Sequence, residues 1–297
     1  MCLVKLFSIV VKNKLNKIYF FNSIFSTFFR NIFKYLLTES IIMIGSINEK
    51  KFLLKQLVKR DLTSKYKDSF LGVLWSFINP LLIMLIFTAI FASLFRFQIK
   101  NFPVYFLIGR IVYEFFMSGT SSAMRSIRSN ASILKKIFVP RYMFSISSVC
   151  YEFINFLISL VILFGVMFIT GADFPPTIIL SIIPMILLIF MVIGIGLILA
   201  VLNTYFTDVG YLYSIFALVL MYASAVFYPM QIVPANIQII FSLNPLYIAI
   251  ECFRCTLMYG IFPDFLILLY FAVFSFMIFG VGFLLFRIHE KKLVLEL

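Results

Sequence analysis

The feature that most constrains the fold is a stretch without any charged side chain, residues 69–95. It follows directly on residues 60–68, which carry three bases and two acids. About 20 apolar residues in helical conformation cross the hydrocarbon core of a bilayer, so this run predicts a membrane span at about residues 71–95. Asn79-Pro80 lies inside the span. Because proline removes a backbone donor, we expect this pair to face protein or a polar cavity rather than lipid.

The composition of the whole chain agrees with a membrane protein. Hydrophobic residues make up 63% and charged residues 12% of the 297 residues, and the mean hydropathy is +1.09. Soluble domains are about half apolar and a quarter charged. The net charge of +13 comes from bases that flank apolar runs. These bases therefore indicate topology and contact with anionic lipid rather than nucleic-acid binding.

Further apolar runs predict an all-α polytopic protein with six transmembrane helices. The five later spans are expected at about residues 104–124, 142–170, 178–202, 211–228 and 265–286. Residues 229–263 are also apolar but are interrupted by Pro229, Pro234 and Asn244-Pro245. Each unbroken piece is too short to cross, so re-entrant or outer-surface helices are expected before the last span.

The predicted organisation has four parts. Residues 1–47 form a basic extension, which is either an amphipathic arm on the cytoplasmic surface or an upstream stretch before a start at Met43. Residues 48–70 are expected to form an amphipathic interfacial helix, because Leu54, Val58, Leu62 and Tyr66 recur every four residues. Residues 71–286 form the six-helix domain, and residues 287–297 a cytoplasmic tail.

The basic segments set the orientation. Residues 125–141 contain no acid and five bases: Arg125, Arg128, Lys135, Lys136 and Arg141. By the positive-inside rule this loop is cytoplasmic. An even number of spans puts both termini on the same side.

Three charged residues are expected within the membrane. Arg110 and Glu114 are four residues apart and therefore share one helical face, either as a mutually satisfied pair or facing a cavity or partner. Glu152 is either protonated and hydrogen-bonded or paired with Arg110 across helices. Gly194-Ile-Gly196 is a small-residue patch that favours close helix contact.

The residues argue against an enzyme or a metal site. Cys252 and Cys255 have no second cysteine pair nearby, and the single histidine is His289, so they are interpreted as small apolar side chains and no metal site is predicted. No catalytic or cofactor-binding residue is predicted either. The sequence contains no G-x-x-x-x-G-K-[ST] loop to hold ATP phosphates. Any ATP-driven step requires another polypeptide.

Four motifs resemble the permease subunits of bacterial ABC exporters for polysaccharides, the group that moves O-antigen, capsule and teichoic acid chains. The first lies around the first span: Arg60, Asp61, Leu62, Lys65, Tyr66, Lys67, Ser69, Leu71, Gly72, Leu74, Trp75 and Pro80. The second is in the basic loop: Asn130, Leu134, Lys135, Lys136, Pro140 and Arg141. The third is Leu202, Asn203, Asp208, Phe227, Tyr228, Pro229, Val233 and Pro234. The fourth is Asn244, Pro245, Leu246, Glu251 and Arg254. Tyr142 replaces the usual acid after the basic loop, and Thr207 replaces the usual base before Asp208.

The resemblance implies a homodimer that binds two separate ABC ATPases, with ATP and Mg held by the ATPases. It implies a polyprenyl-diphosphate-linked glycan as substrate and the bacterial cytoplasmic (inner) membrane as location. Residues expected to couple to the ATPase are Arg60, Asp61, Asn130, Leu134, Lys135, Lys136, Pro140, Arg141 and Asp208. Residues expected in an outer gate are Asn244, Pro245, Glu251 and Arg254.

Aromatic residues make up 19% of the chain, and their rings can stack on sugars. The expected channel residues are Trp75, Phe77, Tyr113, Phe116 and Tyr228. Arg60, Lys65 and Lys67 are candidates to contact a lipid diphosphate, with anionic phospholipid as the alternative partner.

Two other functions remain open at this point. An exporter of drugs or small lipids would keep the same architecture. A polytopic enzyme acting on lipid-linked glycans would need clustered acids or histidines near the headgroups, whereas the acids here are scattered.

Overall fold

The computed structural model of the chain describes residues 47–66, 74–94, 99, 101–135 and 139–290. By its internal contacts the chain divides into residues 1–53 and residues 54–297. The second unit holds most of α2 (Ile47–Tyr66) and every later helix. All regular elements of the described residues are helices, which confirms the all-α prediction. The predicted N-terminal extension and the last seven residues of the predicted tail lie outside the described residues.

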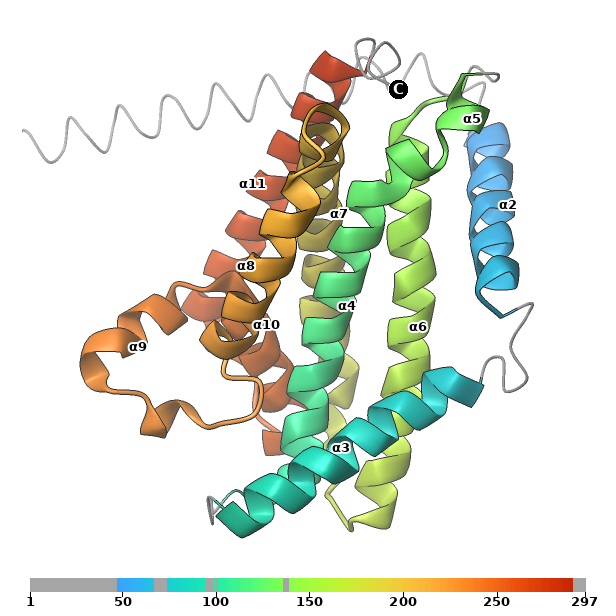
Figure 1. The fold of residues 1–297 in the computed structure, drawn as a ribbon. Coiled ribbons are helices and arrows are strands. Elements are labelled where there is room, and N and C mark those ends of the chain that lie inside the picture. The colour runs from blue at the N-terminus through green and yellow to red at the C-terminus, as the bar shows by residue number, and fades with distance from the viewer. Residues whose placement is uncertain (1–46, 67–73, 95–98, 100, 136–138, 291–297) are drawn as a thin grey trace, which may run out of the picture. The chain divides into compact units, whose positions relative to one another are not determined.

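Four long helices build the core of the second unit. They are α4 (Phe102–Ser129), α6 (Tyr142–Ile169), α7 (Ile182–Tyr205) and α11 (Phe265–His289). Helix α4 packs on α6 and α7, and α7 also packs on α11 (Figure 1). Large apolar side chains fill these contacts, and Phe106, Ile127 and Leu163 are almost completely buried. Transfer of one such side chain from water into a protein core is favourable by about 1.5–3 kcal/mol. Transfer from lipid brings no such gain, so close packing stabilises the contacts between membrane helices.

Glycines bring α7 close to both of its neighbours. A Cβ on Gly194 would lie 2.6 Å from the backbone of α11 at Ile278 and Phe279, and a Cβ on Gly196 would lie 2.7 Å from the Cβ of Ala123 in α4. Two residues along a helix correspond to a rotation of about 200°, so the two glycines face opposite sides. The predicted small-residue patch is thus confirmed as a contact on two faces.

In the part of the chain that the structure describes, three helical segments are long and apolar enough to cross a membrane: Tyr142–Ile169, Pro176–Tyr205 and Phe265–His289. A fourth candidate is the pair Asn236–Ser242 and Pro245–Tyr259, which is bent by 81° at its break. Among the described residues, Ile78–Ile90 and Val209–Ala223 are shorter apolar helices. The chain is therefore a multi-pass membrane protein. That it has six transmembrane helices stays a prediction.

Helices α2 and α3 (Leu74–Leu94) contain the described residues of the first motif, whereas Lys67, Ser69, Leu71 and Gly72 lie outside the described residues. Helix α2 covers most of the range expected for the interfacial helix, with Leu57 buried and Lys55 and Lys59 exposed. Its place in the membrane interface stays a prediction. Helix α3 packs on α4 and α6. Pro80 is buried and Asn79 lines a cavity, so the expectation that this pair faces protein and a polar space is confirmed.

The interrupted segment after α8 (Val209–Ala223) folds into short helices. These are η3 (Met230–Ile232), α9 (Ala235–Ser242), α10 (Pro245–Arg254) and the π-helical turn η4 (Cys255–Tyr259). Asn244 begins α10 by accepting the Leu246 N–H at 3.0 Å, and its amide donates to the Ala223 carbonyl at 2.9 Å. The start of α10 is therefore fixed to the end of α8. A polar side chain at this helix start satisfies backbone groups that a broken helix would leave unpaired.

Candidate functional site

Helix α4 carries a polar stripe, which we call the α4 track. Its residues are Arg110, Glu114, Ser118, Ser121, Ser122 and Arg125. Apart from the adjacent Ser121 and Ser122, successive members are three or four residues apart, which puts the set on one face of the helix. Between residues 104 and 127, the only other residue of α4 that is not buried is Met117. At 1.5 Å per residue the track is about 22 Å long, most of the thickness of a hydrocarbon core.

The side chains of the track bond to one another and to their own helix. Arg110 Nε lies 3.3 Å from Glu114 Oε2, as their spacing predicted. Ser118 donates to the Glu114 carbonyl at 2.6 Å, and Arg125 donates to the Ser121 hydroxyl at 2.7 Å. Sequence reasoning identified the charged pair and missed the serines. The signal was present, because Ser118, Ser122 and Arg125 continue the spacing that begins at Arg110 and Glu114.

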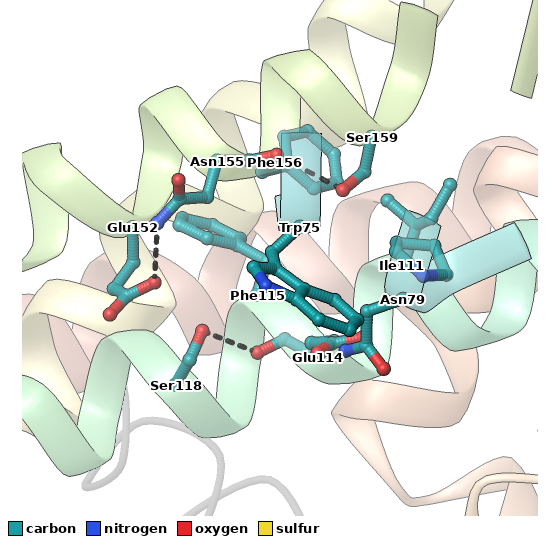
Figure 2. Close-up of a pocket in the computed structure, with 11 residues that line it drawn as sticks. Trp75, Asn79, Ile111, Glu114, Phe115, Ser118, Glu152, Asn155, Phe156 and Ser159 are labelled. Atoms are coloured by element: carbon teal, nitrogen blue, oxygen red, sulfur yellow. Dashed lines mark hydrogen bonds between the residues drawn. The ribbon is translucent and has the colours of Figure 1, made fainter. Parts of the chain in front are cut away.

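A cavity of about 350 Å³ lies between α3, α4 and α6; we call it the Trp75 cavity. Its polar lining consists of Trp75, Asn79, Glu114, Ser118, Glu152, Asn155 and Ser159 (Figure 2). Figure 2 shows the Trp75 ring at the centre, with Glu152 and Asn155 on one side and Asn79 on the other. Half of the Trp75 surface is exposed, at 49%. The single tryptophan of the chain therefore faces a polar space.

Glu152 is held by hydrogen bonds from two residues. Ser122 donates to its Oε1 at 3.1 Å, and Asn155 donates to its Oε2 at 3.0 Å. Of the two arrangements expected for this acid, the structure excludes the pair with Arg110, which pairs with Glu114 instead, and it shows hydrogen bonds to both carboxyl oxygens. The bond from Ser122 connects α6 to the α4 track.

A second cavity, of about 480 Å³, lies along the other side of the track, where α4 faces α8. Glu114, Ser118 and Glu152 line both cavities, so the two spaces meet at the track. Helix α8 contributes Gly210, Tyr213, Ser214 and Ala217. The Tyr113 hydroxyl donates to the Ala217 carbonyl at 2.8 Å. This hydrogen bond fixes α8 to α4 beside the second cavity.

The residues expected to form an outer gate gather around α10. Arg254 is 1% exposed, and its Nη2 donates to the carbonyls of Ala225 and Val226 at 3.0 Å each. Its Nη1 lies 3.7 Å from Glu251 Oε2. Arg254, Glu251, Tyr105 and Tyr247 line a cavity of about 440 Å³. The sequence placed Arg254 in an outer segment, whereas the structure buries it because it satisfies backbone carbonyls that the turn after α8 leaves free.

Several residues expected to contact an ATPase lie near one another. Arg60 of α2 donates to the Asn130 side chain at 2.8 Å and pairs with Asp61 at 2.8 Å. Asn130 precedes the short helix α5 (Ala131–Leu134), in which Leu134 is buried, and exposed Lys135 follows. Lys136 and Lys67 lie outside the described residues, as does the side chain of Lys65.

The other expected coupling residues, Arg141, Pro140 and Asp208, lie apart from this contact. Arg141 donates its backbone N–H to Glu290 Oε1 at 3.1 Å, and its guanidinium bonds the Glu290 carbonyl. Pro140 is half-buried, and Asp208 is exposed before α8. Arg141 is thus held at the end of α11.

The five expected channel aromatics do not share one cavity. Trp75 lines the Trp75 cavity and Tyr113 lines the second one. Phe116 is 4% exposed, and the Tyr228 ring packs on Phe227 and Phe241. The side chain of Phe77 lies outside the described residues. Asn79, Asn155 and the serines of the track, which sequence reasoning did not single out as site residues, supply more of the polar lining than the aromatics do.

The fold and the track define a class: a helical, multi-pass membrane protein with a polar path along a core helix. The chain belongs to the ABC-2 type transporter family, which matches residues 53–258.

Its relatives have names that refer to polysaccharide. It is 30% identical to the O-antigen export system permease protein RfbA of Klebsiella pneumoniae, over 74% of this chain and 86% of the relative. It is 24% identical to the polysialic acid transport protein KpsM of Escherichia coli, over 82% and 96% of the two chains. It is also 24% identical to the capsule polysaccharide export inner-membrane protein CtrC of Neisseria meningitidis serogroup A, over 72% and 80%.

Proposed function

We propose that this chain is the permease subunit of an ATP-driven exporter that moves lipid-linked polysaccharide across the bacterial cytoplasmic membrane. The names of the relatives that match most of its length support polysaccharide as the cargo. The same relatives disfavour export of a drug or small lipid. The acids that line the cavities described above, Glu114, Glu152 and Glu251, are each hydrogen-bonded or ion-paired, which disfavours a membrane enzyme.

The α4 track is the observation that carries this proposal. A glycan has many hydroxyl groups, and each loses its hydrogen bonds to water if it enters hydrocarbon. A transmembrane path for such a chain therefore needs polar groups along most of the membrane thickness. Serines, two arginines and a glutamate provide them on the one unburied face of α4, and cavities border that face on both sides.

The energy for transport comes, in this proposal, from two separate ATPases that hold ATP and Mg. The Arg60–Asn130 hydrogen bond supports a coupling surface made of α2 and the start of α5, because it joins two elements that are 70 residues apart. Exposed Lys135, directly after α5, extends that surface, and exposed Asp208 before α8 is a separate contact in this proposal. Movement of either element is then transmitted to α4, which ends at Ser129.

The working unit in this proposal is a homodimer, with six spans per copy, both termini cytoplasmic and residues 48–70 in the interface. The exposed apolar side of α8 supports a second copy, since Tyr211, Leu212, Ile215, Val219 and Tyr222 are all more than half exposed. Asn244, Pro245, Glu251 and Arg254 form the outer gate.

The test uses a strain from which this gene is deleted, and the deletion is expected to abolish surface polysaccharide. The strain is complemented with the wild type, with Ser118→Leu/Ser122→Leu, or with Ser242→Leu as the control. Ser242 is exposed on α9 and lines none of the cavities described. The wild type and the control restore surface polysaccharide, while the double variant leaves lipid-linked glycan inside the cell at equal protein level. Unchanged surface polysaccharide on deletion of the gene would refute the proposal.

A further inference from the structure

We propose that the Trp75 cavity is a binding subsite for uncharged sugar rings and that it discriminates against anionic ones. The inference rests on the proposed function and adds a substrate class to it. Three observations carry it: an aromatic face, a set of planar hydrogen-bonding groups, and the sign of the charges in the lining.

The aromatic face belongs to Trp75. An exposed tryptophan on a membrane protein ordinarily lies at the lipid headgroups. Trp75 instead lies among Asn79, Glu114 and Asn155 in the lining of the cavity (Figure 2). The negative face of an indole attracts the weakly positive C–H groups that cover one side of a pyranose ring. A sugar stacked there keeps its hydroxyl groups directed sideways, toward the polar residues.

The hydrogen-bonding groups match those hydroxyls. Asn79 and Asn155 provide amides, which both donate and accept, and Ser118 and Ser159 provide hydroxyls. Glu114 and Glu152 provide carboxyl oxygens, each already held in place by a neighbour. A planar amide or carboxyl group can contact two adjacent hydroxyls of one ring. The cavity volume of about 350 Å³ lies in the usual range for a small-ligand site.

The charges in the lining decide which sugars are accepted. Two acids and no lysine or arginine line the described part of the Trp75 cavity. Arg110 lines only the second cavity and is paired with Glu114. Arg110 offsets the charge of Glu114, whereas Glu152 is bonded only by Ser122 and Asn155. A sugar that carries a carboxylate or phosphate therefore meets like charge beside Glu152, which disfavours its binding. Neutral rings meet no such penalty.

Trp75 also reports on its own site, because it is the only tryptophan in the chain. The full chain is purified into lipid nanodiscs, and its emission is excited at wavelengths that tyrosine does not absorb. The probes are a neutral maltooligosaccharide and an oligosialic acid of the same length. We expect a saturable change of emission with the neutral probe and an apparent affinity weaker by about tenfold with the anionic probe, equivalent to about 1.4 kcal/mol.

Variants assign the signal to the cavity. Glu152→Gln removes a charge and keeps a hydrogen-bond acceptor. It should therefore reduce the difference in apparent affinity between the neutral and the anionic probe. Asn155→Leu removes the amide and should weaken binding of the neutral probe. Asp173→Asn, which removes an acid that lines neither the Trp75 cavity nor the second one, is the control and should behave as the wild type.

Three outcomes would overturn the inference. They are no response to the neutral probe, equal affinity for the two probes, and an Asn155→Leu response equal to that of the wild type. Each leaves the proposed function standing if the gene still restores surface polysaccharide. Loss of that restoration, with the emission response intact, would instead refute the proposed function.

Discussion

Arg254 of α10 stacks on Tyr105 of α4, with the guanidinium carbon 3.6 Å from the centre of the ring. The same guanidinium bonds the carbonyls of Ala225 and Val226, and the Tyr105 hydroxyl donates to the Tyr228 carbonyl at 3.0 Å. Ala225 has a positive φ of 47°, which interrupts regular backbone bonding at this turn. One buried cation therefore holds together α4, α10 and the chain that leaves α8.

Arg254→Lys is predicted to destabilise the protein. Lysine keeps the charge, but it cannot stack as a flat group while it bonds two carbonyls. We expect the free energy of unfolding to fall by about 2–4 kcal/mol, because a buried hydrogen-bonded charge loses most of its partners. The measurement is the midpoint of heat-induced unfolding in detergent. Tyr105→Phe, which keeps the ring and loses one hydrogen bond, should cost only about 1 kcal/mol. Equal midpoints for Arg254→Lys and the wild type would contradict the assigned role.

Gly282→Ala is predicted to separate α7 from α11. A methyl group at position 282 would overlap the backbone of Gly194, and backbone cannot rotate away as a side chain can. Overpacking of this kind costs about 1–3 kcal/mol. Gly165→Ala is the matched control, because nothing lies within 4 Å of the Cβ it would add. Because alanine has a higher helix propensity than glycine, Gly165→Ala should instead raise the free energy of unfolding by up to about 1 kcal/mol. The comparison of the two unfolding midpoints tests the contact, and a Gly282→Ala midpoint at or above that of the control would argue against it.

How much of the fold and of the candidate site could be predicted from the sequence depends on how far apart along the chain the interacting residues are. The helices, the Arg110–Glu114 pair and the Gly194–Gly196 patch follow from spacings of a few residues, and the structure confirms them. The serines of the α4 track were equally local but were not recognised. The burial of Arg254 depends on carbonyls 28 and 29 residues away in a non-helical turn. Nothing in the local sequence predicts which backbone groups a turn leaves free.

Asn130→Leu is predicted to uncouple ATP hydrolysis from export in the proposed complex with a separate ATPase. Leucine cannot accept the hydrogen bond from Arg60, so α2 and α5 lose their direct polar connection. Export should fall while ATP hydrolysis by the complex persists. Asn130→Asp keeps the acceptor for Arg60 and should retain more export than Asn130→Leu, although it loses the bond to the Ser126 carbonyl. Equal export by the two variants would show that the Arg60 contact does not matter for coupling.

Glu290→Ala is predicted to loosen the C-terminal end of α11 with a small effect on overall stability. Its carboxylate accepts the Arg141 N–H at 3.1 Å and lies 3.6 Å from Arg287 Nη1. Because these groups are only partly buried, we expect a loss of about 1 kcal/mol or less. The guanidinium of Arg141 bonds a backbone carbonyl, so that contact survives the substitution. Hydrogen exchange should quicken at the N-terminus of α6, around Tyr142 and Met143, and stay unchanged at the centre of α7. Glu290→Gln keeps one acceptor oxygen, so its backbone amides at the start of α6 should exchange more slowly than those of Glu290→Ala. Identical amide exchange in both variants and the wild type would rule out a positioning role for this carboxylate.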